Sequence, residues 1–291
     1  MPITGNAVTQ TVGRCRRRGR DGLRAGAFGL VVATLAGMAA TAPVLAQEFP
    51  LREKYEAVGV EAVETAELAA SFESMIVVDA RSEYEYQTLH IQDAHSIPLA
   101  SRGFAPEVVE LAQSSGQPLV FYCNGELCAV SYRAAARALE AGVEDARVYD
   151  AGVFAWANAH PERAVLLGQP LGDPGRLISS EEFKAHLLGE DAFYARIDAQ
   201  AAPLIVDIRT RKQRQGVSLF QARDRHVPLT DDSGELDELI EQAKAEGREM
   251  FFIDATGKQV RWLQYYLEDR GLSDYWFLEG GAASVFESMG L

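Results

Sequence analysis

The sequence at residues 118–135 reads PLVFYCNGELCAVSYRAA. An apolar run ends at Cys123, a short loop containing Gly125 follows, and an alanine-rich segment of helical character begins near Ser131. A strand, a tight loop and a helix in this order place a thiol at the end of a buried strand, where backbone N–H groups and a helix N-terminus face its sulfur. Both features favour a negative charge on sulfur, so Cys123 is the candidate nucleophile.

Apolar and helix-compatible segments alternate along the rest of the chain. In the first half the predicted strands are 75–79, 96–99, 118–123 and 146–149, and the predicted helices are 61–71, 106–113 and 130–141. In the second half the predicted strands are 203–207, 226–229, 249–254 and 274–278, and the predicted helices are 179–188, 235–246 and 258–270. Ser179 or Ser180 with Glu182 is a capping signal. This alternation predicts an α/β fold, with parallel sheets covered by helices on both faces.

The two halves form an internal repeat. The matching positions are Asp79-Ala-Arg81 with Asp207-Ile-Arg209, Cys123 with Asp254, and Gly152 with Gly281. Two extra residues of the first half fall within the loop and helix just after Cys123, which indicates a site altered for its own purpose. The predicted organisation is a first domain at 47–165, a linker rich in Gly and Pro at 166–176, and a second domain at 177–291.

Residues 1–46 are predicted to be a signal peptide. A basic segment is followed by an apolar, alanine- and glycine-rich run at 25–42, and residues 44–46 (VLA) suit a signal peptidase. The alternative is an uncleaved membrane anchor, because the run is near the lower length limit for a membrane span. Cleavage before Gln47 predicts an exported protein, periplasmic in a bacterium, without stable membrane insertion.

The charge of the chain restricts its partners. The formal net charge is −14, and the first 46 residues hold six arginines and one aspartate, so the remainder carries −19. Such an acidic body disfavours nucleic acid and anionic lipid surfaces as partners, and it repels small anionic substrates unless the site is shielded. Three cysteines are too few for a disulfide-built fold. We expect no cofactor or metal, because neither a phosphate-binding glycine loop nor zinc-ligand spacing is present.

Several short motifs occur in the same order in both halves or in the first half alone. The first half holds DAR at 79–81 with Glu85, LHIQDAHSIP at 89–98, the cysteine loop, and AGVFAW at 151–156. The second half holds TGK at 256–258 and EGG at 279–281. Together they resemble the rhodanese-like sulfurtransferase family, in tandem, over about residues 58–162 and 176–291. Leu89 and Asp93 replace glycines that the family usually has.

The resemblance implies a sulfurtransferase in which Cys123 is the nucleophile and persulfide carrier. Its partners are a sulfur donor and a thiol or other nucleophilic acceptor. The implied active-loop and substrate-binding residues are Asn124, Gly125, Glu126, Leu127, Cys128, Ala129, Val130, Ser131 and Arg133. Ser131 is expected to cap the following helix. Because Asp254 cannot carry sulfane sulfur, the second domain is expected to be non-catalytic and to pack against the first, shape the rim of the site or bind a protein partner.

The loop departs from the family pattern. It is expected to be longer than the usual six residues, and it holds Glu126, which disfavours a thiolate and an anionic donor such as thiosulfate. Arg133, expected in the first turn of the helix, offsets this only partly. Phosphatases and arsenate reductases with lengthened loops keep an arginine at the loop's end, and none precedes Arg133 here, which disfavours that chemistry. Cys128 has three interpretations: a resolving cysteine that forms a disulfide with Cys123, a persulfide relay, or a small buried side chain.

Two alternatives to sulfur transfer remain for the whole protein. One is a non-catalytic binding or scaffold module, and the other is a thiol–disulfide redox switch that uses Cys123 and Cys128.

Other polar and aromatic residues favour structural roles. These are the pairs Asp79/Arg81 and Asp207/Arg209 at strand ends, and Trp156, Trp262 and Trp276 in the core or between the domains. The acidic segment 231–246 is predicted to be a solvated helix face. His90 and His95 have no nearby carboxylate or cysteine cluster that would make them metal ligands.

Overall fold

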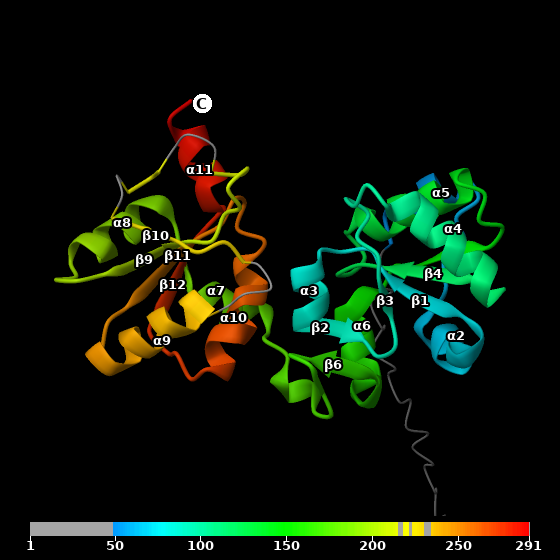
Figure 1. Ribbon diagram of the computed structural model, residues 1–291, viewed down its shortest axis with the longest axis horizontal. Helices are drawn as coiled ribbons and strands as arrows, with labels where there is room; N and C mark the ends of the chain where they lie inside the picture. Colours follow the sequence, from blue (N-terminus) through cyan, green and yellow to red (C-terminus); the bar gives the residue numbers. More distant parts are fainter. Residues whose placement is uncertain (1–48, 215–217, 221–222, 230–233, 291) are drawn as a thin grey trace, which may run out of the picture. The chain divides into compact units, whose positions relative to one another are not determined.

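The computed structural model describes residues 49–214, 218–220, 223–229 and 234–290 (Figure 1). These residues belong to one compact unit. The predicted signal peptide, residues 1–46, lies outside the described residues. Within the described part of the chain, no helix combines the length and the apolar character that crossing a bilayer requires.

The first half is built on a four-stranded parallel sheet with the order β3-β1-β4-β5. Its strands are β1 (Ile76–Asp79), β3 (His95–Ser96), β4 (Leu119–Tyr122) and β5 (Ala146–Tyr149). Successive side chains of a strand point to opposite faces, so Val120 and Phe121 enter two different cores. Helices α4 (Phe104–Ser115) and α5 (Ala129–Glu140) cover one face, while α2 (Thr65–Ala70) and α6 (Gly152–Ala159) cover the other.

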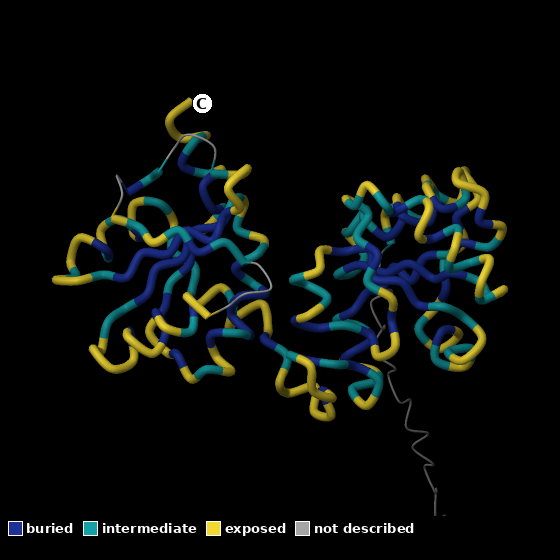
Figure 2. Tube along the Cα trace, in the orientation of Figure 1, coloured by how far each residue is buried: buried dark blue, intermediate teal, exposed yellow. Residues whose placement is uncertain are grey.

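The second half repeats this arrangement with a five-stranded parallel sheet of order β10-β9-β11-β12-β8. Its strands are β8 (Leu187–Leu188), β9 (Leu204–Asp207), β10 (Arg225–His226), β11 (Met250–Ile253) and β12 (Tyr275–Leu278). Helices α9 (Gly234–Glu246) and α10 (Val260–Asp269) cover one face, and α8 (Glu190–Asp198) and α11 (Gly281–Ser288) cover the other. Figure 2 shows the central strands of both halves as buried chain. The predicted α/β class with parallel sheets between helices is confirmed.

The stretch predicted as a linker carries ordered structure. Strands β6 (Ala164–Leu166) and β7 (Gln169–Pro170) form an antiparallel hairpin that extends β2 (Leu89–Ile91). Leu171, just beyond the hairpin, is buried in a core of the first half. Leu167 and Gly168 therefore make a hairpin turn. The Gly and Pro residues of this stretch belong to that turn as well as to the connection between the halves.

Several smaller elements complete the chain. They are α1 (Arg52–Glu56), α3 (Glu83–Thr88), α7 (Ser180–Ala185) and the 3₁₀ turns Phe72–Ser74, Pro161–Arg163 and Pro174–Arg176. The helix predicted at 179–188 is too long. The observed helix ends at Ala185, and residues 187–188 form β8, which pairs with β12. Its predicted capping box is confirmed, since Ser179 Oγ accepts the Glu182 N–H at 3.1 Å and the Glu182 carboxylate accepts the Ser179 N–H at 2.8 Å.

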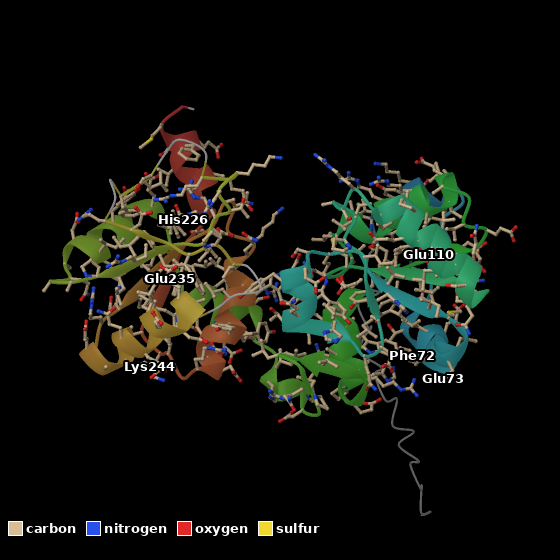
Figure 3. The ribbon with its side chains drawn as sticks, in the orientation of Figure 1. Phe72, Glu73, Glu110, His226, Glu235 and Lys244 are labelled. Atoms are coloured by element: carbon tan, nitrogen blue, oxygen red, sulfur yellow. A yellow bond between two sulfur atoms is a disulfide. The ribbon has the colours of Figure 1, made fainter. Side chains whose placement is uncertain are left out.

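Helix α9 presents a solvated charged face, as its sequence predicts. Glu235 and Lys244 are exposed (Figure 3), whereas Leu236 and Ile240 are buried in the core. Helix α10 instead has buried residues on two sides. Its Trp262 and Tyr265 belong to a core of the first half, which confirms the predicted core or interdomain role of Trp262.

Candidate functional site

Cys123 directly follows β4 and is 2% exposed. Strand β4 is central, because it pairs in parallel with β1 on one side and β5 on the other. The carboxyl ends of these strands meet at one edge of the sheet, which is where α/β folds place their ligand sites. The sequence prediction that the thiol lies at the end of a buried strand is correct.

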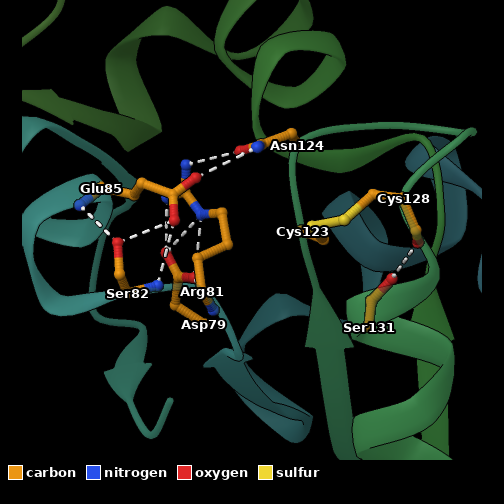
Figure 4. Close-up of a disulfide and its surroundings, with 8 residues drawn as sticks. All are labelled: Asp79, Arg81, Ser82, Glu85, Cys123, Asn124, Cys128 and Ser131. Carbon is orange, nitrogen blue, oxygen red and sulfur yellow. Dashed lines mark hydrogen bonds and ion pairs between the residues drawn. A yellow bond between two sulfur atoms is a disulfide. The ribbon is translucent and has the colours of Figure 1, made fainter. Parts of the chain in front are cut away.

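The sulfur of Cys123 is bonded to that of Cys128, with the two Cα atoms 6.2 Å apart (Figure 4). Cys128 is partly exposed and is the N-cap residue of α5. Between the cysteines the chain makes a turn in which the Cys128 N–H donates to the Gly125 carbonyl at 2.9 Å. Leu127 at the tip of this turn is 83% exposed. In this oxidised form neither sulfur is a nucleophile, so any thiol chemistry begins with reduction.

Three expectations about the loop and its helix are wrong. Ser131 does not cap α5, because the helix begins at Ala129; the buried Ser131 hydroxyl donates to the Cys128 carbonyl at 3.5 Å. Arg133 accordingly lies beyond the first turn. The loop is also not lengthened, since six residues separate β4 from α5 and six separate β11 from α10. The two extra residues lie in α5, which has 12 residues against 10 in α10.

Gly152 forms the floor beneath the loop. Its φ is +74°, and a Cβ on it would lie 2.4 Å from the Gly125 backbone nitrogen and 2.5 Å from the Asn124 carbonyl carbon. The next residue donates its N–H to the Cys123 carbonyl at 2.9 Å. Only glycine permits both the positive φ and this close approach of two backbones.

A buried polar network holds the first residue of the loop. The Arg81 guanidinium is paired through Nε and Nη2 with the Asp79 carboxylate, and its Nη1 donates to Asn124 Oδ1 at 3.0 Å. Asn124 Nδ2 in turn donates to Glu85 Oε1 at 3.1 Å (Figure 4). Burial lowers the pKa of Arg81, but the charge and hydrogen bonds of Asp79 outweigh it and raise the pKa, so this arginine stays charged. The predicted structural pairing of Asp79 with Arg81 is confirmed, and its link to the loop is new.

A cleft of about 1640 Å³ opens over the loop. Of the predicted site residues it is lined by Cys123, Asn124, Gly125, Glu126, Leu127, Cys128, Val130 and Arg133. Ala129 and Ser131 do not line it. Sequence reasoning missed the residues that the second half contributes, which include Lys258, Gln259, Arg261 and Trp262. The repeat was the available signal, because these residues occupy the loop and helix that correspond to the cysteine loop and α5.

The second half fills its corresponding loop with a carboxylate. Asp254 follows β11, and its carboxylate accepts the N–H groups of Gly257 at 2.6 Å and Gln259 at 2.8 Å. Burial raises the pKa of Asp254, and the backbone N–H donors oppose that rise. A Cβ on Gly281 would lie 2.5 Å from Asp254 Oδ1, so Gly281 has the place that Gly152 has in the first half. The backbone of this loop thus solvates an anion that the chain itself supplies.

The histidines near the site have local roles. His90 Nδ1 lies 2.7 Å from the Tyr86 carbonyl and its ring stacks on Tyr86, and burial lowers its pKa. His95 is an exposed residue of β3. Within residues 49–290, outside the gaps, no group of three or more His, Cys, Asp or Glu side chains is arranged to hold a metal ion.

One protein-family model matches part of the first half of the chain. Residues 63–159 match the model of the rhodanese-like domain. A protein of Bacillus halodurans aligns with 42% of this chain and 88% of its own, at 21% identity and a TM-score of 0.34. A thiosulfate sulfurtransferase of Pseudomonas aeruginosa aligns with 79% of this chain and 43% of its own, at 20% identity and a TM-score of 0.36. A single-domain sulfurtransferase of Saccharomyces cerevisiae aligns with 35% and 91%, at 16% identity and a TM-score of 0.29.

No curated protein sequence matches the chain. The family match covers the sheet β3-β1-β4-β5, Cys123 with its loop, and Gly152 beneath it. Residues 63–159, which contain this sheet and this loop, are therefore similar to a rhodanese-like domain.

Proposed function

We propose that this protein is a rhodanese-type sulfurtransferase that carries sulfane sulfur as a persulfide on Cys123. One observation carries the proposal: the match to a rhodanese-like domain includes a cysteine at the carboxyl end of the central strand β4, directly before α5. The N-terminus of α5 and the N–H groups of the loop favour a thiolate there. The second half acts as a non-catalytic copy, because Asp254 stands where a thiol would be needed.

The reaction consists of two displacements on sulfur. In the first, the Cys123 thiolate attacks the sulfane sulfur of the donor, a new S–S bond forms, and the rest of the donor leaves with the bonding electron pair. With thiosulfate as donor the leaving group is sulfite. In the second, an acceptor thiolate attacks the outer sulfur of the persulfide, and Cys123 leaves as a thiolate.

The disulfide assigns Cys128 a part in this cycle. A reducing dithiol, or two single thiols in succession, first opens the Cys123–Cys128 bond, giving two cysteine thiols and the disulfide of the reductant. If no acceptor arrives, the Cys128 thiolate attacks Cys123 Sγ of the persulfide, the disulfide forms again, and the outer sulfur leaves as hydrosulfide. Cys128 in this role is a resolving cysteine, and it protects the persulfide carrier from further oxidation in an exported protein.

The chain as a whole is acidic, but cationic side chains line the cleft, so the cleft suits an anionic donor. Arg133, Lys258 and Arg261 line it, and they offset Glu126 and Glu140. Two of these cations come from the second half, so they could not be assigned to the site from the cysteine loop alone. Ordinary small-molecule sites have volumes of roughly 300–1,000 Å³. This cleft is larger, which leaves room for an acceptor beside the bound sulfur.

A second candidate function is a thiol–disulfide switch, and the bonded pair Cys123–Cys128 is the observation that favours it. In that function the two cysteines exchange electrons with partner thiols and take up no sulfur. The partly exposed Cys128 would be attacked first, because Cys123 is buried.

The deciding experiment measures the mass of the peptide that carries both cysteines. Protein reduced and freed of reductant is incubated with thiosulfate or an organic persulfide, and the peptide is then treated with cyanide. We expect a gain of one sulfur that cyanide removes, and we expect Cys123→Ser to abolish it. Cys128→Ser is the matched control, which should take up sulfur without prior reduction because it cannot form the disulfide. Return to the disulfide with no sulfur gain in the parent, and none in Cys128→Ser, would favour the switch.

Export is a separate part of the proposal. The first residue of the mature protein, determined by N-terminal sequencing from the native host, is expected to be Gln47. An intact chain beginning at Met1 in the membrane fraction would favour the uncleaved anchor.

A further inference from the structure

Trp262 connects the second half of the chain to the first. It lies near the start of α10, and its side chain is almost fully buried, at 3% exposure. Its indole stacks on the Phe154 ring, with ring centroids 5.3 Å apart and planes 18° from parallel. The same indole lies against the Arg81 guanidinium, with Cζ 5.0 Å from the ring centroid. A residue of the second half therefore covers one face of a buried cation of the first half.

Arg81 is the residue that holds the cysteine loop in place. Its Nε and Nη2 are used by the Asp79 carboxylate and the Leu89 carbonyl, which leaves Nη1 for Asn124 Oδ1 at 3.0 Å. Asn124 directly follows Cys123, and its amide is fixed on the other side by Glu85 (Figure 4). The position of the guanidinium thus determines the position of the loop's first side chain.

We propose that Trp262 is a positioning residue for the cysteine loop, and that it acts through Arg81 and Asn124. Its indole excludes water from the guanidinium face and attracts the cation, which keeps Nη1 directed at Asn124. Without the indole, water competes for Nη1 and the clamp on Asn124 loosens. The loop backbone beside Cys123 is then held less firmly, so it stabilises a thiolate there less well.

Through Trp262 the second half, which has no cysteine, contributes to the site. It rests on the proposed function only in its consequence for sulfur transfer, because the coupling concerns the reactivity of Cys123 itself. The chain also contains a matched control for it. Trp276 packs on Arg196 in the same way, with Cζ 3.9 Å from the ring centroid, but that arginine is paired with Glu249 instead of with a residue of the cysteine loop.

The test is the pH profile of Cys123 alkylation by iodoacetamide, followed by mass spectrometry in a Cys128→Ser background. We expect Trp262→Leu, which keeps apolar volume, to move the midpoint to higher pH and to lower the rate at pH 7 by about three- to tenfold. Asn124→Ala should have a similar effect, and the double variant should be no slower than the slower single variant. Trp262→Phe should stay close to the parent, and Trp276→Leu should leave the profile unchanged.

Three outcomes would overturn the inference. They are an unshifted profile in folded Trp262→Leu, an equal shift in Trp276→Leu, and multiplicative effects of Trp262→Leu and Asn124→Ala in the double variant. Circular dichroism and the urea midpoint of each variant identify those that fold. Should Trp262→Leu fail to fold, Trp262→His gives the same comparison with a smaller change. The alkylation assay uses no sulfur donor. A protein that transfers no sulfur would therefore refute the proposed function, while the alkylation profiles would still show whether Trp262 affects Cys123.

Discussion

Replacing Gly152 by alanine tests the contact between the floor of the site and the cysteine loop. A Cβ at this position would lie 2.4 Å from the Gly125 nitrogen and 2.6 Å from Gly125 Cα. Both neighbours are backbone atoms, so the loop itself has to move. Gly168 provides a matched control, because it has the same φ of +74° and its Cβ would meet nothing within 4 Å.

The expected loss of stability has two parts. An L-residue in the left-handed region costs roughly 1–2 kcal/mol, and this cost applies to both variants. The forced contact with the loop adds about 1–3 kcal/mol, typical of overpacking, in Gly152→Ala alone. We therefore expect the free energy of unfolding to fall by about 1–2 kcal/mol in Gly168→Ala and by about 2–5 kcal/mol in Gly152→Ala.

Urea unfolding of both variants with the disulfide intact measures these differences, and the sulfur uptake of the reduced proteins measures the consequence for Cys123. Gly152→Ala should lose most of its sulfur uptake, whereas Gly168→Ala should retain that of the parent. Equal destabilisation of the two variants, or full uptake in Gly152→Ala, would show that the loop does not depend on close contact with this glycine.

Two further predictions concern buried carboxylates. Burial raises the pKa of Asp254 above its ordinary 3.8, so the folded state binds this proton more tightly and stability falls as pH rises through the raised pKa. In unfolding measured between pH 3 and 7, the stability of the parent relative to Asp254→Asn should fall as pH rises, and parallel curves would contradict it. Arg52 pairs through Nε and Nη2 with the buried Asp150 carboxylate at 2.7 and 3.0 Å, so Arg52→Ala should cost about 1.5–3 kcal/mol in urea unfolding. Arg147→Ala, whose partner Asp145 is well exposed, is the control and should cost about 0.5 kcal/mol or less.

Local patterns in the sequence predicted much of the architecture. Apolar runs such as 118–123 and 249–254 became central strands because side chains on both faces of a parallel sheet are buried, which makes the whole run apolar. The Ser179–Glu182 capping box formed because its hydrogen bonds join residues three apart. The position of Cys123 at a strand end followed from the same local reading.

Other features of the sequence were misread. The helix predicted from residue 130, with Ser131 as its cap, begins at Ala129, because the turn that the Gly125 carbonyl and the Cys128 N–H close makes Cys128 the N-cap residue. The two extra residues of the first half are found by counting from Cys123, and from Asp254, to the glycine that follows the next helix. That interval includes the helix, whose length differs between the halves. The spacing between two matched residues gives the combined length of the loop and the helix between them. It does not show which of the two is longer.

The fold class, the repeated order of strands and helices, and the cysteine at a strand end could be predicted, because each depends on residues close together in the chain. The surroundings of that cysteine depend on contacts between distant segments, so they are visible only in the folded protein. The Arg81–Asn124 bond joins positions 43 residues apart, and Trp262 reaches the same arginine from the other half. Such contacts arise from how strands order in a sheet and how helices pack on it, and the preferences of single residues contain no information about them.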